Sequence, residues 1–196
     1  LYSAARLGLA LDRAGVSVHV LHAGAIGLQA EGSLLDATPT KLDTDAVHTA
    51  LQTASVLVVP GFVGRTAAGR TCLLGRGGSD LTAIFLAEEL EADRCVLVKD
   101  VNGLFDRDPA VDPRHAKRFD TVTCGDALQL DDSIIQHKAV RYANARARTF
   151  EVAGLLRGPG TQVGAERTAF STDRDDQPLL RVALLGCGTV GEGVQF

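Results

Sequence analysis

The stretch "LLGRGGSDLTA", residues 73–83, places three glycines, an arginine and a Ser-Asp pair between two apolar runs. Helical spacing begins at Ser79 and continues to about Leu90, with Leu81 and Ile84 facing inward. A glycine-rich turn that leads into a helix can bring backbone N–H groups and the positive end of the helix dipole close to an anion. We therefore expect a strand, a tight turn and a helix here, with Ser79 as the helix N-cap.

The segments on either side alternate between short strands and helices. Apolar runs predict strands in "VSVHVL" (16–21), "SVLVVP" (55–60), "CVLV" (95–98) and "TFEVAGLL" (149–156). Helical patterns run from Ser3 to Gly15, from Asp43 or Thr44 through Leu51, and from about Lys138 to Ala147. Strands that alternate with helices in this way are typical of an α/β protein with a largely parallel sheet.

Composition indicates a globular protein with no bias toward nucleic acid or membrane. The 196 residues are 45% hydrophobic and 22% charged, with a formal net charge of −4. No basic stripe, aromatic stacking set or apolar run of membrane-spanning length is present, so we expect neither a nucleic-acid partner nor a membrane span. The four cysteines are Cys72, Cys95, Cys124 and Cys187. Their wide spacing predicts reduced thiols in the cytoplasm and no metal site.

The residues around the glycines suit the binding of a small anion. Arg76 can hold a carboxylate or phosphate through two parallel hydrogen bonds, and Ser79 lies where the helix begins. Asp80 cannot bind an anion itself, so it would orient an amine, a lysine or a metal at the same site. The stretch is therefore either a pocket for a zwitterion or phosphate, or a plain turn with a capped helix and a solvated arginine.

A second candidate loop is "VLVKDVNGLFDRDP", residues 96–109. Lys99 and Asp100 follow an apolar strand, at the end where open α/β sheets place their ligands. Lys99 could neutralise nucleotide phosphates, and Phe105 could lie beside a base. Asp108 and the proline after it close the loop. The alternative is a surface hairpin with scattered charges.

Two long stretches together resemble the catalytic domain of aspartokinases, in the amino acid kinase family. They are "VVPGFVGRTAAGRTCLLGRGGSDLTAIFLAEEL" (58–90) and "VLVKDVNGLFDRDPAVDPRHAK" (96–117), and weaker similarity covers about residues 3–164. The resemblance implies a three-layer αβα sandwich with a mainly parallel sheet. It also implies transfer of a phosphoryl group from MgATP to the side-chain carboxylate of L-aspartate. That nucleophile is already ionised, so positioning and charge cancellation would suffice for catalysis.

The resemblance also implies roles for individual residues. Arg76, Ser79 and Asp80 would bind the amino acid. The nucleotide would be lined by Gly77, Gly78, Lys99, Asp100, Gly103, Phe105 and Asp108. Asp80 and Lys99 would be the catalytic pair, and no metal site made of protein ligands is implied.

The sequence departs from the aspartokinase pattern at several places. The "KFGG"-type phosphate loop is missing, Phe105 replaces a tyrosine, and Ala110 replaces an arginine. The family's "GAKVLHP" stretch is eroded in "DSIIQHKAV" (132–140), where Lys138 follows His137, so Lys138 is not given the usual ATP-binding role. Phe105, Ala110 and the eroded stretch favour an alternative, a degenerate, inactive kinase-like module that serves oligomerisation or regulation. The intact Arg76, Ser79, Asp80 and Asp100 oppose this alternative.

The last residues point to a different domain. Residues 165–178 are polar and lack periodicity, which predicts a linker between a kinase-like domain at 1–164 and a new domain at 179–196. The new domain opens with a strand and a dinucleotide fingerprint formed by Gly186, Gly188, Thr189, Val190 and Gly191. This turn resembles the start of a Rossmann domain in homoserine dehydrogenases.

The order of the two domains resembles bifunctional enzymes of threonine and methionine biosynthesis, which carry aspartokinase and homoserine dehydrogenase activities. The chain contains no methionine and ends soon after the fingerprint, so we expect it to be part of a longer protein. We also expect that protein to be a homo-oligomer. NAD(P) would bind only in that longer protein, because the acidic ribose-binding residue would lie beyond Phe196.

Overall fold

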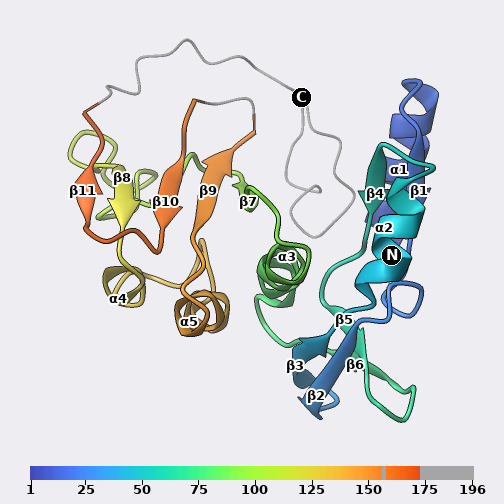
Figure 1. Ribbon diagram of the computed structural model, residues 1–196. Coiled ribbons are helices and arrows are strands. Elements are labelled where there is room, and N and C mark those ends of the chain that lie inside the picture. Colours follow the sequence, from blue (N-terminus) through green and yellow to red (C-terminus); the bar gives the residue numbers. More distant parts are fainter. Residues whose placement is uncertain (156–157, 173–196) are drawn as a thin grey trace. The chain divides into compact units, whose positions relative to one another are not determined.

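The computed structural model describes residues 1–155 and 158–172 (Figure 1). Within them, residues 1–73 and residues 74–172 belong to two compact units, called unit 1 and unit 2 below. The boundary falls at Leu74, directly before the glycine-rich turn and inside the region expected to be one kinase-like domain. The fingerprint at 186–191 lies outside the described residues. None of the described helices combines the length and the apolar character that crossing a bilayer requires.

Unit 1 contains two helices and two small sheets. Its elements are α1 (Tyr2–Arg13), β1 (Val18–Val20), β2 (Gln29–Ser33), β3 (Asp36–Lys41), α2 (Thr44–Leu51), β4 (Val56–Val58), β5 (Val63–Arg65) and β6 (Thr71–Leu73). β1 pairs in parallel with β4, and the other sheet has the order β3-β2-β5-β6. The Asp43 side chain accepts a hydrogen bond from the Ala46 amide at 3.0 Å, which confirms the expected start of α2. α1 begins at Tyr2, with Leu1 rather than Ser3 as its cap.

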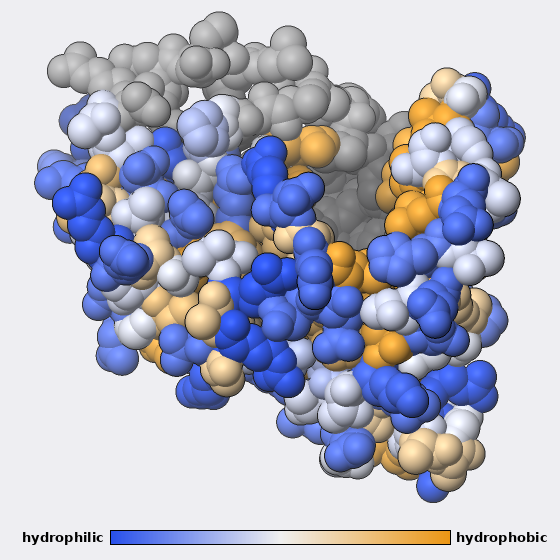
Figure 2. Space-filling view, in the orientation of Figure 1, coloured by the Kyte–Doolittle hydropathy of each residue, from blue (hydrophilic) through white to orange (hydrophobic). Residues whose placement is uncertain are grey.

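Apolar side chains remain exposed on unit 1. In α1 only Gly8 is buried, although the helix carries several leucines. Orange surface is visible in the region of α1 at the upper right of Figure 2. The exposed apolar residues of this unit include Tyr2, Leu7, Leu9, Val20 and Leu51. Exposed apolar surface of this kind is a candidate contact surface.

Unit 2 is a five-stranded sheet with three helices. Its elements are α3 (Gly78–Glu89), β7 (Val96–Lys99), β8 (Phe119–Val122), α4 (Cys124–Ala127), α5 (His137–Ala145), β9 (Phe150–Gly154), β10 (Thr161–Val163) and β11 (Ala169–Phe170). The strand order is β11-β8-β10-β9-β7, in which β7 is parallel to β9 and β8 is parallel to β10. Figure 1 shows α3, α4 and α5 next to one another along this sheet. These parallel pairs and helices confirm the expected α/β fold class, and the sheet also contains the antiparallel pairs β9–β10 and β8–β11.

The core of unit 2 forms where α3 and α5 pack together. Phe85 of α3 meets Tyr142 of α5 edge to face, with ring centroids 6.3 Å apart. The buried residues of the two helices and the sheet include Leu81, Ile84, Val140, Val152, Val163 and Val122. Along β10 the residues are buried, exposed and buried in turn, as expected for a strand with one covered face.

Two expectations from the sequence need correction. The N-cap of α3 is Gly77, in the left-handed region with φ of 73°, and the helix begins at Gly78. The expectation that Ser79 caps the helix is therefore wrong, because glycine allows the chain to turn into the helix without a side-chain cap. Part of the expected linker is also ordered, since Ala169–Phe170 forms β11 and pairs with β8.

Candidate active site

The glycine-rich turn is tightly constrained. Gly75 and Gly77 have φ of 75° and 73°, and the Gly78 amide donates to the Gly75 carbonyl at 2.9 Å. The Gln136 side chain lies so close to Gly77 that a Cβ at this position would overlap it. Only glycine therefore fits position 77, both for its backbone and for the space available. The turn holds the first amides of α3 at the start of the helix, where they lack intrahelical acceptors.

Asp80 and Lys99 form the central contact of the site. Asp80 lies in the first turn of α3, and Lys99 is the last residue of β7. The Lys99 ammonium donates to both Asp80 carboxylate oxygens, at 2.8 and 2.9 Å. The two side chains are 22% and 14% exposed, so the ion pair is largely shielded from water. The structure thus brings together the two residues predicted to be catalytic.

The two other predicted amino-acid ligands are more exposed. The Arg76 guanidinium lies 3.9 Å from the Asp132 carboxylate, and its side chain is 76% exposed. An exposed pair at this distance holds an arginine only weakly, so a carboxylate ligand could replace Asp132. Ser79 is exposed in the first turn of α3. Both side chains are accessible to a ligand at the glycine turn.

Lys138 also lies against the glycine turn. Its ammonium donates to the Leu74 carbonyl at 2.8 Å, immediately before the glycines. The eroded stretch 132–140 therefore forms one wall of the turn, through Asp132, Gln136 and Lys138. Lys138 was not predicted to be a site residue, because its position in the sequence differs from that of the family's lysine. The structure adds a third cation beside Arg76 and Lys99.

Residues 100–108, called the nucleotide loop below after their predicted role, follow β7 directly. Asp100 and Asp108 are exposed, and the Asp108 carboxylate accepts from the Ala110 amide at 2.8 Å. Phe105 is partly buried and forms an isolated β-bridge with Arg118. Gly103 has φ of 107°, and a Cβ there would lie 2.5 Å from the Thr161 hydroxyl. The loop is therefore fixed at its middle and open at its two ends.

A buried hydrogen-bond network anchors this loop. The Asn102 side chain accepts from the Gly154 amide at 3.0 Å. The Thr161 hydroxyl accepts from the Leu104 amide at 2.8 Å and donates to the Phe119 carbonyl at 2.6 Å. Neither Asn102 nor Thr161 was predicted to belong to the site. The one available signal was that both are polar residues next to apolar strands.

A carboxylate beside the loop is stabilised in its charged form. The Lys117 amide donates to the Asp106 carboxylate at 2.8 Å, and Arg107 lies 3.4 Å from the same side chain. The hydrogen bond from the Lys117 amide, more than Arg107, lowers the pKa of Asp106 below its ordinary value. Asp106 thus remains ionised and holds the loop against residue 117.

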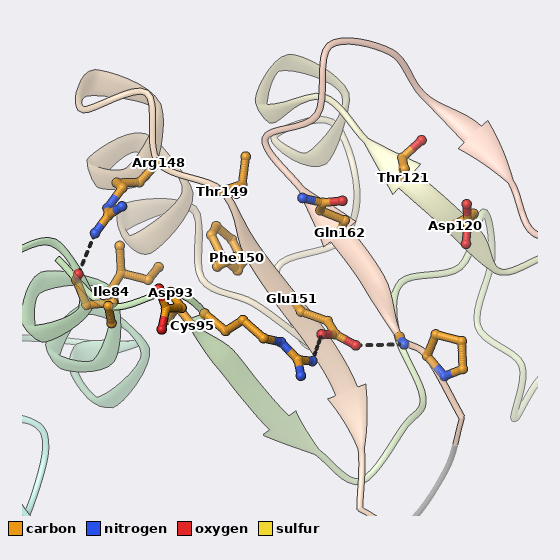
Figure 3. A pocket seen from close by; sticks show the side chains of 15 residues that line it. Ile84, Asp93, Cys95, Asp120, Thr121, Arg148, Thr149, Phe150, Glu151 and Gln162 are labelled. Carbon is orange, nitrogen blue, oxygen red and sulfur yellow. Dashed lines mark hydrogen bonds and ion pairs between the residues drawn. The ribbon is translucent and has the colours of Figure 1, made fainter.

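A separate hollow of about 360 Å³ lies at the start of β7 and contains none of the predicted site residues (Figure 3). Glu151 accepts from the Gly160 amide at 3.0 Å and from Arg94 at 2.8 Å. The Gly160 hydrogen bond, followed by Arg94, lowers the pKa of Glu151. Arg148 binds Glu88 at 2.5 Å on another side of the hollow. Glu151, Arg94 and Arg148 are thus already paired with protein groups.

Protein side chains alone do not form a metal site in the described residues. Among residues 1–155 and 158–172, no three His, Cys, Asp or Glu side chains gather around a possible ion position. A magnesium ion that enters with a nucleotide needs few protein ligands, because phosphate oxygens and water supply most of its coordination. The cations and amides at the glycine turn fit the phosphates of such a complex.

Comparison with known proteins gives a family match for most of the chain. The profile of the Amino acid kinase family matches residues 2–148. The chain is 32% identical over 180 residues to an aspartokinase of Pseudomonas aeruginosa, covering 90% of this chain and 43% of that protein. It is 32% identical over 184 residues to an aspartokinase of Helicobacter pylori, covering 92% and 45%. The chain thus spans less than half the length of these curated relatives.

Solved structures show the same fold. Escherichia coli aspartokinase III, crystallised with aspartate and ADP, superposes with a TM-score of 0.71 at 27% identity, over 82% of this chain and 37% of that one. Aspartate kinase from Synechocystis gives a TM-score of 0.66 at 27% identity, over 87% and 28%.

Proposed function

The chain belongs to the amino acid kinase family, and from this premise we propose that it transfers the γ-phosphoryl group of MgATP to the side-chain carboxylate of L-aspartate. The observation that supports this proposal most strongly is the shielded Asp80–Lys99 pair at the N-terminus of α3. It places a fixed ammonium group where the glycine turn, α3 and the nucleotide loop meet. An anionic donor and an anionic acceptor need such a group between them.

The proposed reaction needs little acid–base chemistry. The aspartate carboxylate is already ionised near neutral pH, so no residue has to remove a proton from it. Arg76 would bind a carboxylate of the amino acid, with Ser79 beside it, while Asp80 orients the Lys99 ammonium toward the transferred group. Lys138 would add positive charge at the glycine turn. Catalysis would then depend on alignment and charge neutralisation.

The nucleotide would lie along the loop that follows β7. Gly77 and Gly78 present the turn and the first amides of α3, which suit phosphate oxygens. Phe105 offers an aromatic surface for the base, and Asp100, Gly103 and Asp108 would complete the pocket. A bound magnesium ion would supply charge neutralisation on the phosphates.

We also propose that the longer protein has a second activity. The fingerprint at 186–191 would open a homoserine dehydrogenase domain that binds NAD(P) and is joined to the kinase domain in one bifunctional chain. We expect a cytoplasmic homo-oligomer, and the exposed apolar residues of α1 are consistent with a subunit contact. Sequencing the flanking coding region and measuring the mass in solution would test both points.

Arg76 provides the sharpest test of the kinase proposal. In the full-length protein, we expect Arg76→Ala to raise the KM for L-aspartate at least about tenfold, because a charge-assisted contact is lost. Aspartyl phosphate can be trapped with hydroxylamine to measure the rate. Arg141→Ala, which removes an exposed arginine from α5, should leave this KM unchanged. An unchanged KM in Arg76→Ala would contradict the role of Arg76.

A further inference from the structure

Arg118 is a buried arginine that the proposed reaction does not use. It precedes β8 and is only 6% exposed. Its guanidinium donates to the Gly160 carbonyl and to the Ser171 hydroxyl, each at 2.8 Å. Its Nε has no hydrogen-bond partner among the described residues. No carboxylate in the described part of the chain forms an ion pair with it. Its charge is therefore met only by neutral oxygens.

Burial of such a group opposes folding. Removing a cation from water costs several kcal/mol unless an ion pair and hydrogen bonds compensate for it. Arg118 has two hydrogen bonds to neutral acceptors for a guanidinium with five N–H donors, and its Nε has no partner among the described residues, so its compensation is incomplete. A buried polar group with an unmatched donor calls for an explanation beyond packing.

The position of Arg118 supplies that explanation. Its backbone forms the β-bridge with Phe105, in the middle of the nucleotide loop. A Cβ on Gly103 would lie 3.3 Å from the Arg118 Cδ, so the side chain runs directly behind that glycine. Gly160, which Arg118 binds, precedes Thr161, which holds the Leu104 amide. Arg118 thus lies against both the nucleotide loop and the residue that precedes β10, the strand that anchors this loop.

Arg118 also joins the loop to residues 167–171, called the strap below. The Ser171 amide donates to the Arg118 carbonyl at 2.9 Å, in addition to the side-chain contact. Phe170 stacks on Phe119 with ring centroids 4.7 Å apart. The Thr121 hydroxyl donates to the Arg167 carbonyl at 2.9 Å. The strap is therefore fastened to β8 along its length, and Arg118 connects it to the nucleotide loop.

We propose that Arg118 is a positioning residue that orders the nucleotide loop before a nucleotide binds, and that the strap is part of this device. The role in nucleotide binding rests on the proposed function, whereas the ordering of the loop does not. The planar guanidinium reaches Gly160 and Ser171 at once. A lysine carries the same charge but lacks the rigid fork that spans both acceptors. Arg118→Lys separates geometry from charge.

Hydrogen exchange on the ligand-free 196-residue chain tests the ordering directly. We expect Arg118→Lys to raise amide exchange in residues 102–106 about tenfold, since each lost hydrogen bond is worth about that factor. The amides of β7 and β9 should keep their protection. Arg114→Lys makes the same chemical change at an exposed position nearby and should leave the loop unchanged. An unchanged loop in folded Arg118→Lys, or equal loss of protection throughout unit 2, would overturn the proposal.

Ligand affinities measured on the same variants give the functional result. MgADP binding should weaken about tenfold in Arg118→Lys, while L-aspartate binding changes less than about twofold, because one lost hydrogen bond affects only the loop. Equal weakening of both ligands would overturn the positioning role. Absence of MgADP binding in the unaltered chain would refute the kinase proposal instead, and hydrogen exchange would still decide the role of Arg118.

A milder variant guards against a failure to fold. If Arg118→Lys unfolds, Ser171→Ala removes the acceptor on the strap and leaves the arginine in place. Faster exchange confined to the strap and residues 102–106 supports the proposal. Protection of the loop equal to that of the unaltered chain overturns it.

Discussion

In the proposed site, the Asp80 carboxylate accepts hydrogen bonds from the Lys99 ammonium at both of its oxygens. Replacing it by asparagine would leave the ammonium of Lys99 without its counter-charge in a largely shielded position. We expect Asp80→Asn to lower the free energy of unfolding by about 1–3 kcal/mol, the usual range for a charged hydrogen-bonded partner. Urea denaturation would measure this change. Asp93→Asn, at an exposed aspartate of the same unit, should change it by less than about 0.5 kcal/mol.

Tyr142 differs from Asp80 because its buried polar group is not paired within the described residues. Its hydroxyl is buried and has no hydrogen-bond partner among the described residues, while Arg146 lies over its ring at 3.8 Å. Removing an unsatisfied polar atom should stabilise the fold, so we expect Tyr142→Phe to raise the free energy of unfolding by about 1 kcal/mol. Tyr2→Phe, where the side chain is exposed, should have no effect. A loss of stability in Tyr142→Phe would show that the hydroxyl has a partner.

At the scale of elements, patterns in the sequence predicted α2, α3, β7 and β9, because apolar periodicity and strand composition are local properties. The N-cap of α3 could not be predicted, since the choice between Gly77 and Ser79 depends on backbone angles. The anchors of the nucleotide loop were missed for a similar reason. Thr161 lies 57 residues from Leu104, and no local pattern reveals such a contact.

The contact between β9 and Gly160 should respond to pH through Glu151. Hydrogen bonds lower the pKa of this carboxyl in the folded state, so its contribution to stability is present above the ordinary value of 4.5 and is lost as pH falls through the folded pKa. We therefore expect Glu151→Gln to destabilise the fold at pH 7, and the difference from the unaltered chain to shrink below about pH 4. Urea denaturation across this range would measure it. Glu166→Gln, at an exposed residue, should show no such trend.

The nucleotide loop should depend on its glycine. Gly103 has φ of 107°, and a Cβ there would come within 2.5 Å of the Thr161 hydroxyl. We expect Gly103→Ala to distort the loop, to lower the free energy of unfolding by about 1–3 kcal/mol and to weaken MgADP binding. In Gly158→Ala no described atom lies within 4 Å of the new Cβ, so this variant should keep both properties. Equal affinities for MgADP in Gly103→Ala and Gly158→Ala would contradict a fixed conformation of the nucleotide loop.

At the scale of the whole molecule, the sequence was most informative about family and least informative about organisation. The long stretches around Arg76 and Lys99 identified the kinase-like region, and the family profile covers residues 2–148. The division into two units at Leu74 and the strap that follows β10 were not predicted. Both depend on contacts between residues far apart in the chain. All predicted kinase-site residues lie in unit 2, where Lys138 joins them.

The most direct test of the proposed site is calorimetric titration of MgATP, and then L-aspartate, into the 196-residue chain. We predict saturable binding of both, with one molecule of each per chain. In Asp80→Asn both affinities should fall at least about tenfold, because Lys99 loses the carboxylate that orients it, while Asp93→Asn should match the unaltered chain. Absence of saturable binding for both ligands would contradict a working kinase site and favour a scaffold role for this domain.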